Sequence, residues 1–186
     1  MKTIFFVYVF FFLNISYAIN VGQETGLQLP RYVSVKSDDA NLRVGPSKNY
    51  PILIKYVIAN FPLKVVEEYD DWRRIVDLHN NSGWIHKSLL KGERNGIIIS
   101  SDKKNIKIFN TKDGKHIGEI SKGAIVKLPK CKNRWCYINK DNNKGWIEKK
   151  YIWGVNEEEN FGVSFLNNLI NYFYMSVNFI EGEFFN

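Results

Sequence analysis

The sequence predicts an all-β protein built from two small β-barrels in tandem, followed by a C-terminal amphipathic helix or tail. One short signature occurs twice: Trp72-Arg-Arg-Ile precedes Gly83-Trp-Ile, and Trp135-Cys-Tyr-Ile precedes Gly145-Trp-Ile, about 63 positions later. In both copies, short apolar runs alternate with polar turns, as in the strands of small all-β domains. The length also suits two small domains. A barrel of this size presents a surface groove and has little room for a buried catalytic pocket.

The first 18 residues are expected to be an export signal. Lys2 supplies a positive charge, Ile4–Leu13 are ten consecutive apolar residues, and Ser16-Tyr17-Ala18 has the small-x-small pattern of a signal-peptidase site. As a helix, the apolar run is too short to span a bilayer core of about 30 Å. The alternative is an uncleaved membrane anchor. With cleavage after Ala18, the mature chain is exported to the periplasm or cell envelope.

Charge is distributed unevenly along the chain. Residues 31–94 carry 11 Lys and Arg against 8 Asp and Glu, whereas residues 96–155 carry 14 against 5. The tail, residues 156–186, has five Glu and no Lys or Arg. A strongly basic second domain can attract anionic envelope material, with an attraction that salt weakens. The alternative is a solvated Lys-rich surface without a partner. Nucleic acid is disfavoured as a partner by the predicted export, not by the charge.

Strands and turns can be followed through the first copy. Tyr32-Val-Ser-Val alternates between apolar and polar sides, and Gly45-Pro-Ser marks a loop. From Trp72 to Leu78 the residues alternate again. The linker at residues 91–96 is short, so we expect the two barrels to touch.

The first copy contains three motifs in a fixed order: Asn41-Leu-Arg-Val-Gly-Pro-Ser, then Trp72, then Gly83-Trp-Ile-His. Together they resemble the bacterial Src-homology-3-like (SH3-like) domain family. The resemblance implies two tandem SH3-like small barrels. It is specific for the fold, because several spaced motifs agree, and weak for function, because this fold hosts many unrelated binding roles.

The second copy departs from the family pattern at its start, where Asn105-Ile-Lys-Ile-Phe lacks the Gly-Pro corner. Its later part, with Cys131-Lys-Asn-Arg-Trp-Cys, Gly145-Trp and Trp153-Gly-Val, is similar to a tandem subfamily found in envelope proteins of Gram-negative bacteria. The resemblance covers roughly residues 31–155 and implies barrels at 31–94 and 96–155; with the export signal at 1–18 and the acidic and apolar tail at 156–186, the sequence predicts four segments.

Cys131 and Cys136 bracket a four-residue turn, so the two residues can face each other across a hairpin. Opposed residues in such a pair lie about 4.5 Å apart at Cα, at the short end of what a disulfide spans. The predicted export to an oxidising compartment favours a structural disulfide. The alternatives are a reduced structural pair, a metal site and a nucleophilic cysteine. The last two lack further ligands or a nearby base.

By the resemblance, aromatic side chains line a ligand groove. The candidate groove residues are Tyr32, Tyr50, Tyr69 and Trp72 in the first barrel and Trp135, Tyr137 and Tyr151 in the second. Trp72 and Trp135 open strands after turns, a position from which an indole can stand exposed at the rim of a groove. Trp84 and Trp146 follow glycine and are expected in the core. Each candidate has the alternative of simple packing.

No residue pattern predicts catalysis, and we expect the protein not to be an enzyme. His79, His86 and His116 fall in turns or on the surface, and no pattern indicates a phosphate loop or a metal cluster. We therefore predict no cofactor, no metal ligands and no catalytic residues.

The tail contains an uncharged stretch at residues 161–180 with apolar residues at helical spacing. An amphipathic helix there can pack over a barrel, or contact a membrane or partner; disorder is a further alternative.

Export, fold and basic charge together favour a non-catalytic binding module of the bacterial cell envelope that recognises peptidoglycan or another wall polymer. The alternative is a periplasmic protein–protein adaptor that binds a peptide or protein. An accessory domain of a wall hydrolase would need a catalytic region, and the 31 residues after Val155 are too few to form one. The sequence does not determine the oligomeric state.

Overall fold

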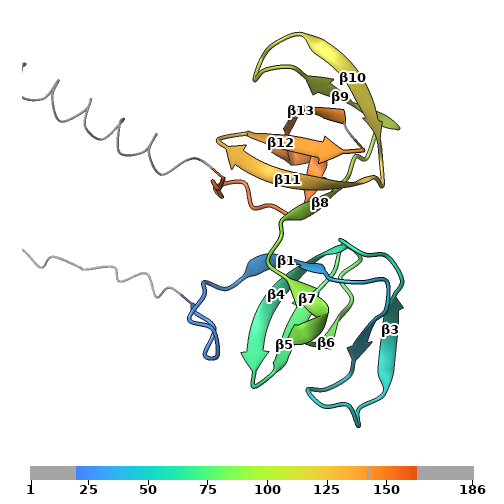
Figure 1. The fold of residues 1–186 in the computed structure, drawn as a ribbon, viewed down its shortest axis with the longest axis vertical. Coiled ribbons are helices and arrows are strands. Elements are labelled where there is room, and N and C mark those ends of the chain that lie inside the picture. The colour runs from blue at the N-terminus through green and yellow to red at the C-terminus, as the bar shows by residue number, and fades with distance from the viewer. Residues whose placement is uncertain (1–19, 142, 163–186) are drawn as a thin grey trace, which may run out of the picture.

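The computed structural model describes residues 20–141 and 143–162, which form two antiparallel sheets, each curled into a small barrel. Figure 1 shows the two barrels one above the other. The all-β fold class with two tandem SH3-like barrels is therefore confirmed. The predicted signal peptide and nearly all of the predicted tail helix lie outside the described residues. Within the described ranges, no helix has the length and apolar character needed to cross a bilayer.

The first barrel is one sheet with the strand order β3-β2-β6-β5-β4-β1-β7. The edge strand β3 has no partner on its outer side among the described strands. The elements are β1 (Arg31–Val35), β2 (Ala40–Arg43), β3 (Ile52–Tyr56), β4 (Pro62–Tyr69), β5 (Trp72–Val76), β6 (Ser82–His86), the 3₁₀ turn η1 (Lys87–Leu89) and β7 (Leu90–Lys91).

The second barrel repeats this topology with the order β10-β9-β13-β12-β11-β8-β14. Each strand corresponds to the first-barrel strand at the same place in that order, so the repeated signature reflects a repeated fold. The elements are β8 (Asn95–Ile98), β9 (Asn105–Phe109), β10 (His116–Ser121), β11 (Ile125–Lys132), β12 (Trp135–Lys140), β13 (Asn143–Glu148), the 3₁₀ turn η2 (Lys149–Tyr151) and β14 (Ile152–Trp153).

Each barrel has its own apolar core, formed by the side chains on the inner side of its strands. Leu42, Ile75 and Ile85 are fully buried in the first barrel, and Ile138 and Ile147 in the second. The inward residues alternate with outward ones along each strand, because successive side chains point to opposite faces. The core therefore leaves the outward side chains free to form binding surfaces.

The two barrels contact each other, as the short linker predicted. The ring of Tyr32 in β1 meets Trp153 in β14 edge-on, with centroids 5.3 Å apart. The buried amide of Asn95 donates a hydrogen bond of 2.9 Å to the Ser34 hydroxyl, which itself donates to the Glu93 carbonyl at 2.8 Å. These contacts join the barrels through aromatic packing and a buried polar chain.

Both ends of the described chain are held against the barrels, and they leave on the same side of the molecule (Figure 1). Near the N-terminus, the Thr25 hydroxyl and backbone N–H both donate to the Glu68 carboxylate of β4, at 2.8 and 2.9 Å. Near the C-terminus, Phe161 exchanges two backbone hydrogen bonds with Cys131 of β11, at 3.0 and 3.1 Å. One hollow between the two segments is lined by Leu27, Gln28, Pro30, Arg31, Asn156, Glu158 and Glu159.

Candidate functional site

The hairpin formed by β11 and β12 positions the main candidate surface. Its register pairs Lys130 with Tyr137, Cys131 with Cys136, and Lys132 with Trp135. Because neighbouring residues point to opposite faces, the cysteines turn inward and the other two pairs turn outward. Cys131 and Cys136 are fully buried and joined in a disulfide, which confirms that prediction. The disulfide thus joins the two strands directly beneath the outward face.

Trp146 stands at the centre of this outward face. It lies opposite Tyr137 in the β12–β13 register, and the two rings meet edge-on at 5.4 Å. Gly145 faces inward, where a Cβ atom would come within 2.8 Å of the Phe109 carbonyl oxygen of β9. Only glycine therefore allows β13 to approach β9 this closely, and the next side chain along, Trp146, must point outward.

Lysine side chains surround the two rings. The Lys130 ammonium lies 5.1 Å from the centroid of each ring, and the Lys112 ammonium lies 4.6 Å from that of Trp146, within cation–π range. Lys132 is next along the same outward side of β11. We call this surface the Trp146 face; its residues are Lys112, Lys130, Lys132, Tyr137 and Trp146.

The loop between β9 and β10 reaches over the face from the other side. Asn110 Oδ1 accepts hydrogen bonds from the backbone N–H groups of Thr111 and Lys115, which closes the loop. Asp113 then pairs with Arg134, in the β11–β12 turn, at 2.8 Å. The loop and the turn are thereby tied together, with Lys112 held above the indole.

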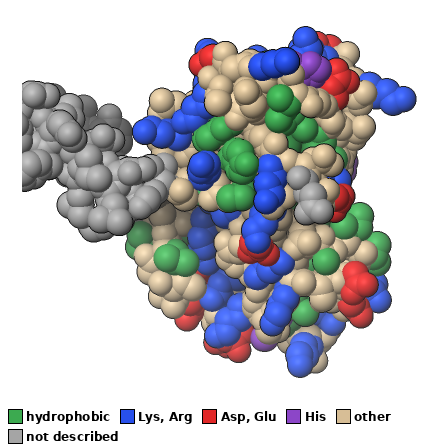
Figure 2. All heavy atoms as spheres, turned by 45° about the horizontal axis from the view of Figure 1, so that its top comes forward, with side chains coloured by type: hydrophobic (Ala, Val, Ile, Leu, Met, Phe, Trp, Pro, Cys, Tyr) green, Lys and Arg blue, Asp and Glu red, His purple; other side chains and the backbone are tan. Residues whose placement is uncertain are grey.

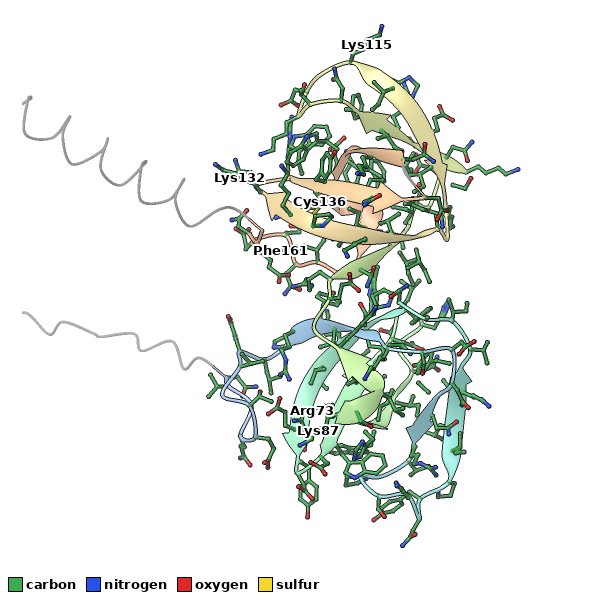
Figure 3. All side chains as sticks on the ribbon, viewed as in Figure 1. Arg73, Lys87, Lys115, Lys132, Cys136 and Phe161 are labelled. Carbon is green, nitrogen blue, oxygen red and sulfur yellow. A yellow bond between two sulfur atoms is a disulfide. The ribbon has the colours of Figure 1, made fainter. Side chains whose placement is uncertain are left out.

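Positive charge concentrates at the Trp146 face. Partial burial lowers the pKa of the Lys112 ammonium, and the charges of Lys132 and Lys130 lower it further. Among the described residues, no carboxylate forms an ion pair with any of these three lysines, whereas Arg134 nearby is paired. Figure 3 labels Lys132 at the end of the hairpin, and Figure 2 shows Lys and Arg side chains beside hydrophobic ones on the visible surface.

The first barrel has a face at the corresponding position, with different chemistry. Trp84 lies opposite Arg74, and the ring of Tyr69 meets the Trp84 indole edge-on at 6.3 Å. Arg74 forms an ion pair of 3.0 Å with Glu67, so its charge is balanced. We call this surface the Trp84 face; its residues are Glu67, Tyr69, Arg74 and Trp84.

Trp72 and Trp135 are buried, whereas Trp84 and Trp146 are partly exposed. Trp72 and Trp135 were candidates for an exposed groove rim, with simple packing as the alternative; only 8% of Trp72 and 5% of Trp135 is exposed, so both are packed. His86 covers Trp72 edge-on at 5.3 Å, and Phe109 covers Trp135 edge-on at 5.6 Å. Trp84 and Trp146, expected in the core, are half-buried on the outward faces.

The physical reason is strand alternation. In each Gly-Trp-Ile, the glycine and the isoleucine occupy the inner side, so the tryptophan between them must point out. Gly83 and Ile85 are buried in β6, and Gly145 and Ile147 are buried in β13. The alternation of small and apolar inward residues was visible in the sequence and could have placed Trp84 and Trp146 outward.

The other predicted groove residues lie in several places. Tyr69 and Trp72 are opposed in the β4–β5 hairpin, and Trp135 and Tyr137 share the outward side of β12. Tyr32 is buried at the contact between barrels, against Trp153. The structure thus brings one predicted pair together on each hairpin and places Tyr32 elsewhere.

Tyr50 and Tyr151 lie outside the two faces. Tyr50 is exposed in the loop between β2 and β3, where its ring covers Gly45 and its carbonyl accepts a hydrogen bond of 2.8 Å from Arg43. Tyr151 lies in η2, where its hydroxyl accepts a hydrogen bond of 3.1 Å from Lys103. The lysines of the Trp146 face were not predicted, because residues 112 and 130 meet only through the fold.

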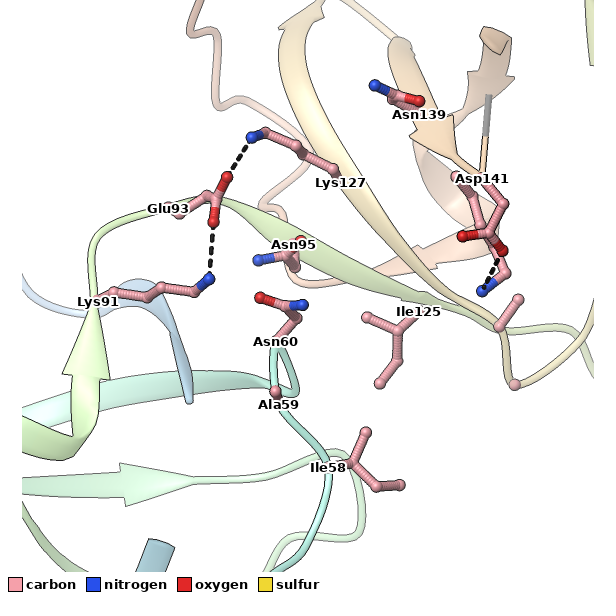
Figure 4. A pocket seen from close by; sticks show the side chains of 13 residues that line it. Ile58, Ala59, Asn60, Lys91, Glu93, Asn95, Ile125, Lys127, Asn139 and Asp141 are labelled. Carbon is pink, nitrogen blue, oxygen red and sulfur yellow. Dashed lines mark hydrogen bonds and ion pairs between the residues drawn. The ribbon is translucent and has the colours of Figure 1, made fainter. Parts of the chain in front are cut away.

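A cleft of about 680 Å³ lies between the barrels (Figure 4). Glu93 of the linker bridges its two sides, pairing with Lys91 at 2.7 Å and with Lys127 of β11. Hydrogen bonds from Lys127 and Lys91 lower the pKa of the Glu93 carboxyl to about 2. Lys91, Glu93 and Lys127 are therefore all engaged in the ion-pair bridge between the two barrels.

Among the described residues, no group of three or more His, Cys, Asp or Glu side chains is placed to hold a metal ion. The imidazole Nδ1 of His86 contacts the Ser88 hydroxyl at 2.8 Å in the turn that starts η1. Both cysteines are joined in the disulfide, so neither has a free thiol.

A family model described as bacterial SH3 domain matches residues 36–92 and 111–154, which is more than half of the chain. The chain belongs to the bacterial SH3 domain family. Each match falls in one of the two barrels, so the protein carries two bacterial SH3 domains in tandem. The second match begins at residue 111, after β9, where the sequence lacks the Gly-Pro corner.

Similar solved structures are only distantly related. An NlpC/P60 family protein from Bacillus cereus ATCC 10987 is 12% identical with a TM-score of 0.29, and the match covers 75% of this chain and 61% of that protein. NlpC2 from Trichomonas vaginalis is 10% identical with a TM-score of 0.31, and the match covers 71% and 51%. The chain thus spans less than two thirds of the length of these proteins. No curated protein matches significantly.

Proposed function

We propose that this protein is an exported, non-catalytic binding module of the bacterial cell envelope that recognises peptidoglycan or another wall polymer through the Trp146 face. The observation that carries the proposal is the arrangement there of two aromatic rings and three lysines, with no ion pair to any described carboxylate. Aromatic rings offer apolar area with little loss of side-chain freedom, and unpaired ammonium groups attract anions. Membership of the bacterial SH3 domain family supports a binding role.

Co-sedimentation with isolated sacculi tests this function. The protein purified after export from a bacterial host is expected to sediment with sacculi at low salt and to be released as salt is raised. Absence from the pellet at low salt would contradict the proposal. A zymogram with the same sacculi tests the non-catalytic part, because clearing around the protein band would mean that the protein cleaves the wall.

The alternative is a periplasmic adaptor, and one observation favours it. Strand β3 lies at the open edge of the first sheet, and Ile52, Leu53, Val57 and Ile58 in and beside it are each about half exposed. An unpaired edge of this kind can accept an extended peptide as an additional strand. Crosslinking in cells that yields one discrete protein adduct, without retention on sacculi, would favour the adaptor over wall binding.

A further inference from the structure

The two barrels carry the same row of outward residues on equivalent strands, but its charges differ. In the first barrel the row crosses β4, β5 and β6, and in the second it crosses β11, β12 and β13. Position by position, Glu67, Arg74 and Trp84 correspond to Lys130, Tyr137 and Trp146. The indole is common to both rows, and what changes is the pair of residues beside it.

The charge in the first row is balanced within the row. Glu67 and Arg74 form their ion pair at 3.0 Å, so a charged ligand would have to displace one of the two partners. A half-exposed pair of this kind stabilises the protein little, but it cancels the local potential. Arg43 of β2, opposite Trp84, donates to the Tyr50 carbonyl and has no ion pair among the described residues, so the Trp84 face carries one unpaired charge where the Trp146 face carries three.

The charge in the second row is not balanced. The Lys130 and Lys112 ammonium groups both lie within about 5 Å of the Trp146 ring, and Lys132 follows on the same strand side. The Asp113 carboxylate of the β9–β10 loop is already paired with Arg134. Three like charges are thus kept close by the β9–β10 loop and the β11–β12 hairpin, and an anion between them would relieve their repulsion.

We propose that the Trp146 face binds the phosphate or carboxylate groups of an anionic glycan between Lys112, Lys130 and Lys132, and that the Trp84 face does not. The half-buried rings of Trp146 and Tyr137 supply the apolar surface on which an adjoining sugar ring packs. The choice of a glycan among polyanions rests on the proposed envelope function. Single-stranded nucleic acid, which also binds aromatic and basic surfaces, is the competing ligand class.

A pair of triple variants tests this site with equal changes in net charge. K112Q/K130Q/K132Q removes the three lysines of the face, and K104Q/K107Q/K122Q removes three exposed lysines that lie in or directly beside β9 and β10. The probe is a heparin-derived oligosaccharide, with a neutral dextran oligosaccharide of the same length as its control. Circular dichroism and urea unfolding establish that each variant is folded.

The wild-type protein is expected to bind the heparin oligosaccharide and not the dextran, with affinity that falls as salt rises. The K112Q/K130Q/K132Q variant should lose about tenfold or more in affinity, and the matched variant about twofold or less. Equal losses in the two variants would show that binding follows net charge, and would overturn the site. Unchanged binding by K112Q/K130Q/K132Q would overturn it as well.

Two further arms separate the ligand classes and the two proposals. A dT oligonucleotide of matched charge should bind more weakly than the heparin oligosaccharide; tighter binding with the same dependence on the three lysines would overturn the glycan assignment. Wild-type protein that binds heparin through the face but does not sediment with sacculi would contradict wall binding and leave the site standing. Sedimentation with sacculi that does not depend on the three lysines would support wall binding but contradict the Trp146 face as the binding site.

To identify the source of the anionic groups, sacculi supply carboxylates and purified lipopolysaccharide supplies phosphates. Retention of the wild-type protein on either material, if it is lost in K112Q/K130Q/K132Q, supports the site. The material that retains the protein then identifies the anionic group. Retention on neither, with heparin binding also absent, would overturn the site.

Discussion

Gly145 and Gly83 fix where the two outward indoles stand. A Cβ atom at Gly145 would lie 2.3 Å from the Ile108 side chain and 2.8 Å from the Phe109 carbonyl oxygen, and at Gly83 it would lie 2.6 Å from the Arg43 carbonyl oxygen. Contacts this short with backbone atoms require the strands to separate, since backbone cannot move aside as a side chain can. The glycine of each signature is thus a packing requirement that positions its neighbour.

The Gly145→Ala substitution is expected to destabilise the second barrel by about 1–3 kcal/mol, because one added methyl overpacks the crossing of β13 and β9. Urea unfolding followed by tryptophan fluorescence measures the loss. Gly118→Ala is the matched control, because a Cβ atom there meets nothing within 4 Å. Equal stability of the two variants would contradict the proposed close approach.

Glu68 connects three parts of the first barrel and its N-terminal segment. Its fully buried carboxylate accepts from Thr25, pairs with Arg31 at 2.6 Å and lies 3.4 Å from Arg73. Burial by itself raises the pKa of the Glu68 carboxyl, but the hydrogen bonds from Thr25 and Arg31 outweigh it, and the net pKa is lowered. The ionised carboxylate is therefore the form that stabilises the fold.

The Glu68→Gln substitution is expected to cost about 2 kcal/mol at neutral pH, because the buried guanidinium of Arg73 and the partly buried one of Arg31 lose their counter-charge. A carboxyl whose folded pKa is lowered stabilises the protein above its ordinary pKa of 4.5, and this stabilisation is lost as the pH falls through the lower folded value. The difference between wild type and variant should therefore shrink below about pH 4.5.

Urea unfolding measured from pH 7 down to pH 3 follows this difference. Glu67→Gln is the control, since the neighbouring carboxylate is half exposed and its pair with Arg74 contributes little. A constant difference across the pH range would contradict the assigned role of Glu68.

At the scale of elements, one cross-strand position carries different chemistry in the two barrels. Glu68 opposes Arg73 in the β4–β5 hairpin, and Cys131 opposes Cys136 in the β11–β12 hairpin, at the same place relative to the bulge in each. One hairpin is tied by a buried ion pair and the other by a disulfide. Both ties face inward beneath the outward row, so each barrel fixes the strand pair that presents its face.

Replacing the disulfide by C131A/C136A is expected to destabilise the second barrel by about 2 kcal/mol, because a short closed loop no longer restricts the unfolded chain. Urea unfolding in the absence of reductant measures the change. Wild-type protein treated with a thiol reductant should lose a similar amount, while the variant should not respond to the reductant. A response of the variant to reductant would contradict the disulfide as the cause.

The correspondence of the two rows makes the face transferable. The E67K/Y69K/R74Y variant gives the first barrel the outward residues of the second hairpin, and the heparin oligosaccharide is expected to bind it at two sites instead of one. Calorimetric titration reports the stoichiometry, and E67Q/R74Q, which removes the ion pair without adding lysine, is the control. One site in the triple variant would mean that the row alone does not determine binding, and that the β9–β10 loop is required.

At the scale of the whole molecule, the barrels are held by a contact that neither signature contains. Tyr32 and Trp153 pack edge-on, and the Glu93 bridge crosses the cleft beside them. The terminal segments extend the same arrangement, because one docks on Glu68 and the other on Cys131, at equivalent positions of β4 and β11. Both faces are thereby carried by one connected body.

The Tyr32→Ala substitution is expected to speed tryptic cleavage in the linker, after Lys91 or Arg94, by about fivefold, because an aromatic pair of this kind contributes about 1 kcal/mol to keeping the linker closed. Limited proteolysis under native conditions, with the fragments identified by mass, measures the rate. Tyr69→Ala removes an equal ring that is 60% exposed and far from the linker in sequence. Equal cleavage in both variants would contradict the coupling.

Sequence periodicity predicted both barrels and their order, and the cysteine spacing together with the predicted export favoured the disulfide. The repeated Gly-Trp-Ile and the strand alternation around Trp72 are local patterns, and a local pattern specifies which strands form and which side of each is buried. Cys131 and Cys136 belong to one short hairpin, so their pairing follows from the turn. The signal peptide and the tail helix stay predictions, since they lie outside the described residues.

The sites depended on tertiary structure, because their members come from distant strands and loops. Lys112 reaches Trp146 only when the β9–β10 loop folds over β13, and Tyr32 becomes buried only when the second barrel supplies Trp153. Likewise, Phe109 of β9 covers Trp135 of β12, although β13 lies between these two strands in the sheet. The sequence by itself determined the strands, the inward residues and the hairpin disulfide, since these depend on near neighbours. Only the fold decided which aromatic rings stay open to a ligand and which charges remain unpaired, because exposure and pairing depend on contacts across the chain.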